Sequence, residues 1–410
     1  MHAAFRFSTL ALLVAAASPS AALAADPAGA SLDLRYRYEH VDQAGIAHQA
    51  DAHTLRARVG YLSPSWHGWS ARAEADAVLA LDERHHNDTR NGRRAYPVVA
   101  DPGGAEINQA LLRHDGRYGS TTFGRQRIVL GNQRFVGGSA WRQNEQTYDG
   151  VRLQWTPATS LALDYAWIGG INTIFGPADS AASNRANPAD IDGDSHLLQM
   201  RWQVAPVLAA SAYHHRLRLD DIAVSAAAPL GTLSSRTSAL RLEGRAGAWS
   251  YASEHARQRE LRGNPWRLDS RYALAELGYT LHGVALKAGY ESLGGGSGPG
   301  NHAFQTPLAT RHQFQGWADV FLTTPAAGIV DRYVGATLPL KGGSLQAWFH
   351  TFAPERGGGD YGDEIDLSYA RPIPGVAGLD GLVKLARYRS DDPARTADTD
   401  KLWLQLHYAY

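Results

Sequence analysis

The sequence predicts an all-β fold, a transmembrane antiparallel up-and-down β-barrel of about 18 strands with short periplasmic turns and long extracellular loops. Three observations predict it. Apolar and charged residues alternate along most of the chain. The connections between the segments with this pattern are alternately short and long. After the first segment, no apolar run approaches the roughly 20 residues that a membrane helix needs.

Residues 1–24 have the three parts of a secretory signal peptide. Arg6 supplies a positive charge, an apolar run follows around Leu10 to Ala17, and Ala22-Leu23-Ala24 is a small-x-small cleavage site. The apolar run is too short for a transmembrane helix and lacks a stop-transfer flank. We therefore expect cleavage after Ala24, which leaves residues 25–410 as one outer-membrane barrel domain.

Strict alternation recurs along the chain. Residues 32–39 and 71–77 place Leu, Tyr or Ala on one face and Asp, Arg or Glu on the other, and residues 151–155 and 401–410 repeat the pattern. Such a strand has one apolar and one charged face. A soluble sandwich would turn the apolar face inward, whereas a membrane barrel turns it toward lipid and lines water with the charges.

The connections decide between the sandwich and the barrel. Short ones contain Pro, Gly or His-Gly, as at 63–65, 205–206 and 282–283, while long polar ones span 81–105, 169–194 and 292–328. This alternation is typical of an outer-membrane barrel. The predicted strands are 31–40, 53–62, 69–80, 106–114, 120–127, 148–156, 160–168, 196–204, 208–219, 236–245, 248–258, 271–280, 284–291, 329–338, 344–353, 362–370, 379–389 and 401–410.

Aromatic residues gather near the ends of these strands, where amphipathic rings favour the membrane interface. The terminal aromatic, Tyr410, resembles the insertion signal that the barrel-assembly machinery reads, so we expect that machinery as a partner. The aromatic residues in question are Tyr61, Trp66, Trp69, Trp155, Trp167, Trp202, Trp249, Tyr279, Trp348 and Tyr369.

Composition excludes several classes of site. The chain has no cysteine, so it carries neither a disulfide framework nor a thiolate metal site, which suits an oxidising periplasm. The net charge is zero, so nothing points to nucleic acid as a partner. All but four of the 40 basic residues are arginine. A GC-rich genome would produce this excess without any function. A functional explanation depends on the direction in which the arginine side chains point.

Charged residues opposite the lipid-facing set predict the lining of the lumen, because a charge facing lipid at mid-bilayer costs about 2–4 kcal/mol. Two interpretations stay open. The arginines form a lattice with Asp and Glu that stiffens the wall, or their excess forms a selectivity path for anions. The predicted basic lining residues are Arg35, Arg37, Arg56, Arg58, Arg72, Arg152, Arg201, Arg216, Arg218, Arg241, Arg245 and Lys287.

Arg125 and Arg127 share the parity of Phe123, which should face lipid. Either the register slips at a bulge near Gly124, or the strand has already left the bilayer there. We expect both arginines at the pore mouth.

Catalytic and cofactor motifs are not found. The sequence contains neither GxSxG nor HExxH, and the Gly-rich segment 294–298 is not followed by Lys-Thr. The adjacent histidines at 85–86 and 214–215 would point to opposite faces of a strand. We predict no catalytic residue, no metal and no cofactor. The alternative from another class is a barrel-wall esterase or phospholipase, which needs a Ser–His pair on one wall.

Two motif regions resemble the alginate export family of outer-membrane porins. The first is Gly124-Arg125-Gln126 followed by the segment 144–152, NEQTYDGVR. The second comprises 304–310, FQTPLAT, then 314–319, FQGWAD, and continues through Gly328 to Asp331. The resemblance implies a monomeric 18-stranded barrel in the bacterial outer membrane, with an arginine-rich channel that in founding members passes an anionic uronate polymer.

The sequence and the resemblance together predict a passive channel for anionic saccharides or related carboxylates, with alginate-like polyuronate as the first substrate. A nutrient-uptake porin for small organic acids or aromatic compounds is the alternative. We further expect loop 292–328 to gate or constrict the pore, since long structureless connections are usually functional. Its second half carries Phe304, Phe314, Trp317 and Phe321, which are too apolar to stay in water.

Overall fold

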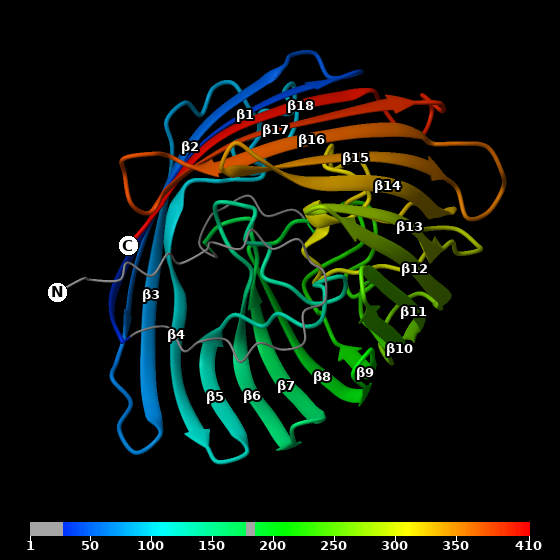
Figure 1. The fold of residues 1–410 in the computed structure, drawn as a ribbon. Helices are drawn as coiled ribbons and strands as arrows, with labels where there is room; N and C mark the ends of the chain where they lie inside the picture. Colours follow the sequence, from blue (N-terminus) through cyan, green and yellow to red (C-terminus); the bar gives the residue numbers. More distant parts are fainter. Residues whose placement is uncertain (1–27, 178–184) are drawn as a thin grey trace.

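A computed structural model describes residues 28–177 and 185–410. These residues form one closed antiparallel barrel of 18 strands, in which each strand pairs with its neighbours in the chain and β1 closes on β18 (Figure 1). The predicted signal peptide and its cleavage site lie outside the described residues. The strands are β1 (Gly29–Gln43), β2 (Ala50–Leu62), β3 (Trp69–Ala80), β4 (Gly104–Gly116), β5 (Gly119–Gln126), β6 (Thr147–Ala158), β7 (Leu161–Asn172), β8 (Asp190–Ala205), β9 (Leu208–Leu217), β10 (Ser235–Ala246), β11 (Trp249–Glu260), β12 (Asp269–Leu281), β13 (Val284–Gly294), β14 (Gly328–Leu340), β15 (Gly343–Ala353), β16 (Gly362–Pro372), β17 (Leu379–Ser390) and β18 (Thr399–Ala409).

The predicted fold class is confirmed, and each of the predicted strands corresponds to one observed strand. The main difference is length, because several strands run further toward the extracellular side than predicted. β8, for example, begins at Asp190 rather than at residue 196. No helix in the described part of the chain is long and apolar enough to cross a membrane.

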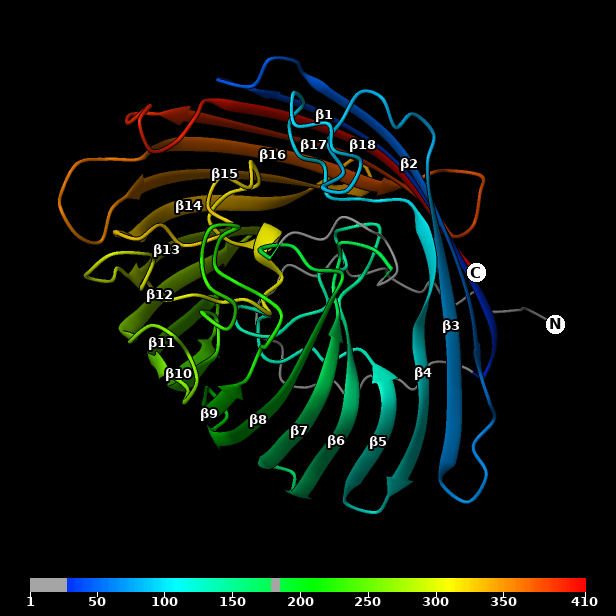
Figure 2. The same ribbon diagram turned by 180° about the vertical axis from the view of Figure 1, so that it is seen from behind.

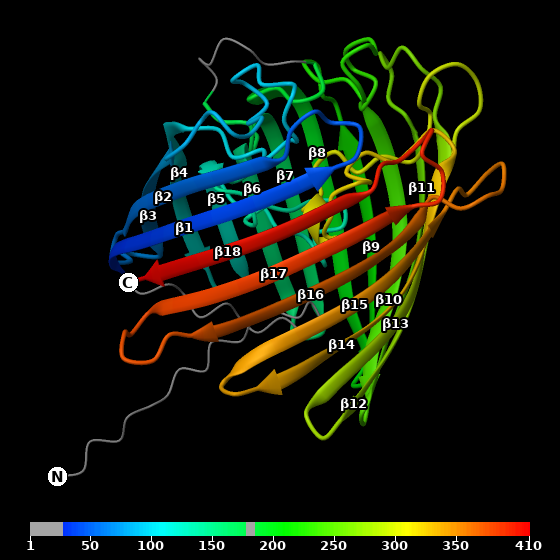
Figure 3. The ribbon, with the colours of Figure 1, turned by 90° about the horizontal axis from the view of Figure 1, so that it is seen from above.

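The short and long connections lie at opposite ends of the barrel. The turn between β12 and β13 consists of His282 and Gly283, whose φ angles of +49° and +82° suit a tight hairpin. The longer connections gather at the end away from the C terminus (Figure 3). This arrangement assigns the turns to the periplasm and the long loops to the cell exterior.

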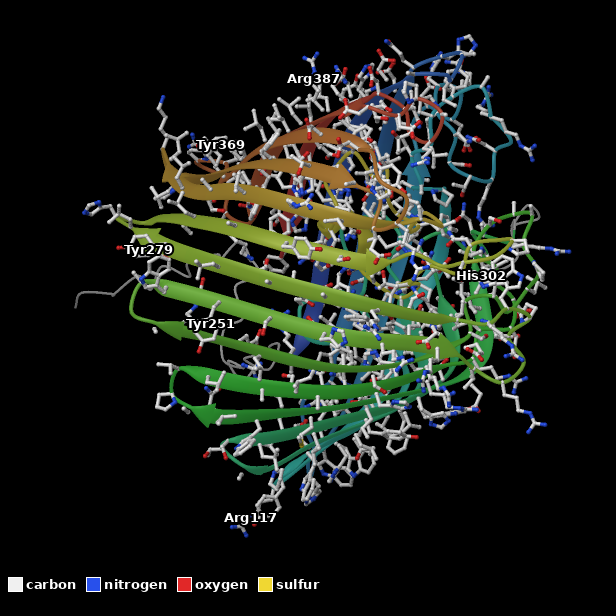
Figure 4. All side chains as sticks on the ribbon, turned by 90° about the vertical axis from the view of Figure 1, so that its right-hand side faces the viewer. Arg117, Tyr251, Tyr279, His302, Tyr369 and Arg387 are labelled. Atoms are coloured by element: carbon white, nitrogen blue, oxygen red, sulfur yellow. The ribbon has the colours of Figure 1, made fainter. Side chains whose placement is uncertain are left out.

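The outer face carries exposed apolar side chains, which in this setting face lipid. Examples are Leu198 of β8, Leu240 of β10 and Leu277 of β12, each about half exposed. Tyr251, Tyr279 and Tyr369 stand at the turn end of the wall in Figure 4. An apolar band edged by aromatic residues is the outer surface of a membrane barrel.

Trp348 departs from the predicted aromatic belt. Its neighbours on the same face of β15 are His350 and Phe352, both buried inside, and its ring lies 6.1 Å from that of Tyr333. The β14 residue opposite it is Gly335, and a Cβ there would meet the indole at 2.1 Å. Trp348 therefore lies on the lumen face, where glycine makes room for its ring.

Two extracellular loops fold back into the barrel. Loop 127–146 (cyan) and loop 295–327 (yellow) lie inside the ring of strands when it is seen from the front and from behind (Figures 1 and 2). Loop 295–327 contains a single short 3-10 turn, Arg311–Gln313. Side chains of both loops belong to the buried apolar clusters, among them Val136, Phe304 and Phe321. The barrel therefore has a packed interior rather than an empty lumen.

Candidate functional site

The lumen wall of β1 and β2 holds loop 127–146 in place. Arg35 donates from Nε to Oε1 of Gln143 and from Nη1 to the carbonyl of Ala140, both at 2.9 Å. Arg37 stacks its guanidinium over the ring of Trp141 at 4.2 Å. These contacts account for two arginines on the inner face of one strand, since each satisfies polar groups that the loop brings inside.

Three of the predicted lining arginines are consequently covered. Arg35, Arg37 and Arg56 do face inward, but their exposed fractions are 7%, 0% and 3%. The loop lies between them and the remaining aqueous space. These arginines bind the loop instead of lining the path, which is a correction to the sequence-based prediction. The cause is an inward loop that strand alternation does not reveal.

Strand β16, three strands from β1 in the closed barrel, holds loop 295–327. The backbone N–H of Ala318 donates to Oε1 of Glu364 at 2.7 Å, and that of Trp317 donates to Oδ2 of Asp366 at 3.2 Å. A Cβ at Gly316 would meet the Glu364 carboxylate at 2.3 Å, so glycine lets the loop approach the wall this closely. The predicted placement of the apolar second half of this loop, against or inside the barrel, agrees with the position found.

The two loops bind each other across the interior. The N–H of Gly137 donates to the carbonyl of Leu308 at 2.8 Å, and Val136 forms a parallel bridge to the same residue. The ring of Trp141 stacks on that of His312 at 4.5 Å. Backbone and aromatic contacts thus join the loops into one internal body.

Asp319 is the ionic centre of this contact. Its carboxylate lies 2.8 Å from Arg142 of the other loop, 2.9 Å from Lys401 of β18 and 2.7 Å from His312. Burial alone would raise the pKa of Asp319, but His312, Lys401 and Arg142 hold it well below its usual range. Burial also keeps the pKa of His312 well below its usual range. We call these four residues the Asp319 junction.

A buried ammonium completes the contact between loops and wall. Nζ of Lys384 on β17 lies 3.8 Å from the ring centre of Trp317, 4.3 Å from that of Trp141 and 5.4 Å from that of Trp403. It also lies 2.7 Å from Nε2 of His312. An ammonium enclosed by indole faces is stabilised by the ring quadrupoles, most strongly where water is excluded.

Another group of charges faces the open part of the interior. The Arg127 cluster consists of Arg58, Arg72 and Arg127 around the carboxylates of Glu74 and Glu145. Arg58 lies 2.9 Å from Glu145 and Arg127 lies 2.7 Å from it, while Arg72 lies 4.0 Å from Glu74. Arg58, Glu74 and Arg127 also line an open cavity of about 400 Å³ beside β1.

The cations of this cluster stand in front of the anions. The exposed fraction of the side chain is 26% for Arg127 and 21% for Arg72, against 5% for both Glu74 and Glu145. The pair Arg201 and Glu243 repeats the arrangement, at 23% and 7%. Asp76, 2.6 Å from Arg58, balances the third arginine of the cluster, yet the surface that the cluster presents to water is guanidinium.

The remaining predicted lining residues lie on the inner face, and three of them have ion-pair partners. Arg152 contacts Asp164 at 2.5 Å, Arg241 contacts Glu254 at 2.7 Å, and Lys287 contacts Glu276 at 2.9 Å. Arg245 has the inward parity of Arg241 and is exposed toward the turn end of β10. The arginines of the wall therefore pair with carboxylates, as the first interpretation holds, and several of them also reach water.

Arg216 and Arg218 do not line the lumen. In the strand register, Arg216 lies opposite His196 and Arg236, on the face that carries the exposed Leu198 and Leu240. Arg218 follows β9 with the same parity and pairs with Asp220 at 3.2 Å. Their inward neighbours are Leu217 and Leu219, which are buried beneath extracellular loops. At the extracellular end, apolar residues are on the inner face and charged residues are on the outer face. This is the reverse of the arrangement expected within the membrane.

The two arginines predicted for the pore mouth separate. Arg125 is paired with Ala110 and Asp149 on the outer face and binds the Asp149 carboxylate with two nitrogens at 2.8 Å. Arg127 follows the end of β5, where the chain turns inward, and it enters the lumen cluster. Strand β5 ends at Gln126, and beyond this point the alternation of faces no longer applies. Arg125 and Arg127 therefore lie on opposite sides of the barrel wall although they are two residues apart.

Sequence reasoning missed loop 127–146 as a component of the lumen. Its return segment, Gln143 to Gln146, is at most 6% exposed, and it overlaps the motif that carries the family resemblance. Arg134 and Arg142 of this loop bind Glu291 and Asp319, at 2.7 and 2.8 Å. The available signal was a non-alternating segment too rich in apolar residues for a solvent-exposed loop.

The barrel wall contains a contact between a serine and a histidine, the pair that the esterase alternative requires. Oγ of Ser238 and Nδ1 of His214 lie 2.8 Å apart on the outer face of β9 and β10. Among the described residues, no carboxylate or amide contacts the other ring nitrogen of His214. A catalytic base needs such an orienting group, so this pair lacks the third member of a hydrolytic triad.

Comparisons with known proteins agree with this architecture. The family model described as alginate export matches residues 27–307, which is more than half of the chain. No curated protein sequence matches it. Acinetobacter baumannii OccAB4 superposes with a TM-score of 0.70 at 14% identity, over 93% of this chain and 97% of that one. Pseudomonas aeruginosa OccK9 (OpdG) gives 0.69 at 17%, over 93% and 98%. At these identities the likeness to solved structures shows the fold, and the family match together with the closed barrel shows that the chain belongs to the alginate export family of outer-membrane channels.

Proposed function

We propose that this channel passes anionic solutes, either saccharides or related carboxylates, through the outer membrane without an energy source. The observation that carries the proposal is the order of charges in the Arg127 cluster. Guanidinium groups are the outermost ionic groups there, with their carboxylates behind them. A carboxylate that reaches the cluster finds planar donors suited to bidentate binding.

Position strengthens this effect. The two inward loops fill much of the interior, so ions pass close to the remaining wall. Fields are concentrated where a low-dielectric wall surrounds a narrow aqueous path. At physiological ionic strength the Debye length is about 8 Å. Charges at a constriction therefore control ion selectivity, and those in a wide vestibule have little effect.

Two substrate classes follow from this path. An alginate-like polyuronate fits the charge of the cluster and is the first candidate. Small organic acids are the second, and the contact between the two loops favours them. Gly137 is hydrogen-bonded to Leu308, and Arg142 is ion-paired with Asp319, so the interior is crossed by a body that a thick polymer would have to displace.

Reversal potentials in planar bilayers under a salt gradient test the selectivity. The wild-type channel should prefer anions. Arg127→Gln and Arg201→Gln each remove an exposed cation from the lumen and should shift the reversal potential toward cations. Arg216→Gln is the matched control, since the same change on the outer face should leave selectivity unchanged. A cation-selective wild type, or an equal shift in the control, would refute the anion path.

Current block distinguishes the two substrate classes. Monomeric and oligomeric uronates of increasing length are added to the wild-type channel. A polymer channel should bind longer oligomers more strongly and release them on the opposite side. A channel for small acids should be blocked best by monomers, and a hydrolytic activity without conductance would favour the esterase alternative instead.

Biogenesis of the chain adds a further proposal. We propose that residues 1–24 are removed as a signal peptide and that the barrel works as a monomer. Tyr410, with an exposed fraction of 84%, is available for recognition by the assembly machinery. Deletion of Tyr410 should lower the amount of heat-modifiable barrel in the outer membrane, whereas unchanged assembly would exclude this role.

A further inference from the structure

The outer face of β9 to β12 carries a group of arginines near the extracellular end. Paired residues of adjacent strands share a face and lie about 5 Å apart. Arg216 of β9 is paired with Arg236 of β10, and Arg236 is paired with Arg259 of β11. Two residues closer to the membrane centre, Arg257 is paired with Arg271 of β12. We call these five residues the outer arginine patch.

The patch has too few carboxylates to balance it. Asp194 lies 3.3 Å from Arg216, and Asp269 lies 2.5 Å from Arg257 and 3.9 Å from Arg259. In the described part of the chain, neither Arg236 nor Arg271 has an ion-pair partner. Like charges directly opposite on a sheet destabilise it. The patch places five cations beside two anions on paired positions of adjacent strands. It is therefore suited to bind an anion from outside the protein.

The surroundings specify an amphiphilic ligand. Toward the membrane centre from the patch, the same face carries His214 and Ser238 together with the exposed apolar side chains of Leu198 and Leu240, at 49% and 52%. In Figure 4 this wall faces the viewer, with the extracellular loops at the right, marked by His302. A molecule bound here would place anionic groups on the arginines and acyl chains on the leucines. The patch therefore lies at the extracellular edge of the apolar outer surface, where we expect the headgroups of the outer leaflet.

The opposite wall differs in charge. At the same height on β1, β16, β17 and β18, Asp42 is paired with Asp400, and Asp363 is paired with Arg389. On this wall the acidic residues are at least as numerous as the basic ones. The concentration of arginine is thus a property of one sector, β9 to β12, and a general surplus of surface charge does not account for it.

We propose that the outer arginine patch binds the phosphate groups of lipopolysaccharide, the glycolipid of the outer leaflet. The two phosphates of a diglucosamine headgroup together supply several oxygen acceptors, and arginine binds phosphate bidentately. The acyl chains then cover Leu198 and Leu240. Bound lipid replaces the repulsion between paired arginines with charge-assisted hydrogen bonds, and it ties one side of the barrel to the outer leaflet.

Native mass spectrometry of the full chain in neutral detergent, titrated with bisphosphorylated lipid A, tests the proposal. Arg236 and Arg271 lack carboxylate partners, so the double variant Arg236→Gln/Arg271→Gln removes charge without breaking an ion pair. It should bind lipid A at least about tenfold more weakly than wild type. The control is Arg387→Gln/Arg389→Gln on the opposite wall, where Arg387 is labelled in Figure 4. Heat-modifiable migration verifies that both variants fold.

Two comparisons decide the nature of the ligand. Dephosphorylated lipid A should bind wild type about as weakly as bisphosphorylated lipid A binds the double variant. Phosphatidylglycerol, with a single phosphate, should compete poorly. Equal binding of lipid A by wild type and the double variant, or equal affinity for phosphatidylglycerol and lipid A, would overturn the proposal.

Discussion

Replacement of Asp319 by asparagine tests whether the two inward loops form one rigid body. The change keeps the size of the side chain and removes one buried negative charge. Arg142, Lys401 and His312 then lose the group that they contact at 2.7–2.9 Å. Glu39 remains nearby, but it lies farther away, 3.6 Å from Arg142 and 3.8 Å from Lys401.

The magnitude follows from burial. All four residues of the Asp319 junction are at most 7% exposed at the side chain, so water does not replace the missing charge. Removal of one partner from a buried ion pair costs about 3–5 kcal/mol. Because Glu39 compensates part of the loss, we expect about 3 kcal/mol. If the junction exists only while the loops touch, separation of the loops becomes about a hundredfold more frequent, since each 1.4 kcal/mol is a factor of ten.

Single-channel recording measures this effect. Asp319→Asn should show frequent brief increases in conductance that wild type rarely shows. Asp400→Asn is the control, because Asp400 is about half exposed and contacts Arg389 on the outer wall at 2.8 Å. An exposed pair of this kind contributes about 0–1 kcal/mol. Identical traces for Asp319→Asn and wild type, with both proteins folded, would show that the ionic junction does not hold the loops together.

Three further predictions concern the same interior. Replacement of residues 296–326 by a short Gly-Ser linker should raise conductance in planar bilayers, and an unchanged value would show that this loop does not narrow the path. Lys384→Met removes the ammonium from its indole cage and should speed protease cleavage of loop 295–327, measured on gels against wild type. Although burial alone would raise the pKa of Glu145, Arg127 and Arg58 lower it to about 2. The resulting stability, on the order of 3 kcal/mol, should be fully present above about pH 4.5 and be lost as the pH falls toward 2, as followed by the temperature of heat modification.

The strand pattern was predictable because the membrane enforces it. Every transmembrane strand must turn apolar residues toward lipid and pair all of its backbone groups, so alternation and turn spacing are visible in the sequence itself. β3 was predicted with the bounds that it has, Trp69–Ala80. Arg72 of this strand was also assigned to the lumen, and the structure places it on the inner face together with Glu74 and Asp76.

The interior was less predictable because it depends on contacts between distant segments. The burial of Arg35 and Arg37 follows from loop 127–146, more than 100 residues away in sequence, and the Asp319 junction joins two loops and β18. No local periodicity encodes such contacts. The apolar content of loop 295–327 did indicate that it packs inside, whereas the position of each anchoring carboxylate depends on the wall opposite.

The misplaced arginines have a common physical cause. In the membrane, the inner face is wet and the outer face is apolar. Above the membrane, loops cover the inner face and water or lipid headgroups reach the outer one, so the two faces exchange character along the same strand. Arg201 and Arg241 lie below this level and point inward, whereas Arg216 and Arg236 lie above it and point outward. A basic residue on an outer-membrane strand thus lines the pore or faces the outer leaflet according to its distance from the extracellular end. Alternation assigns residues to two faces, and only the height of each residue tells which face is in water.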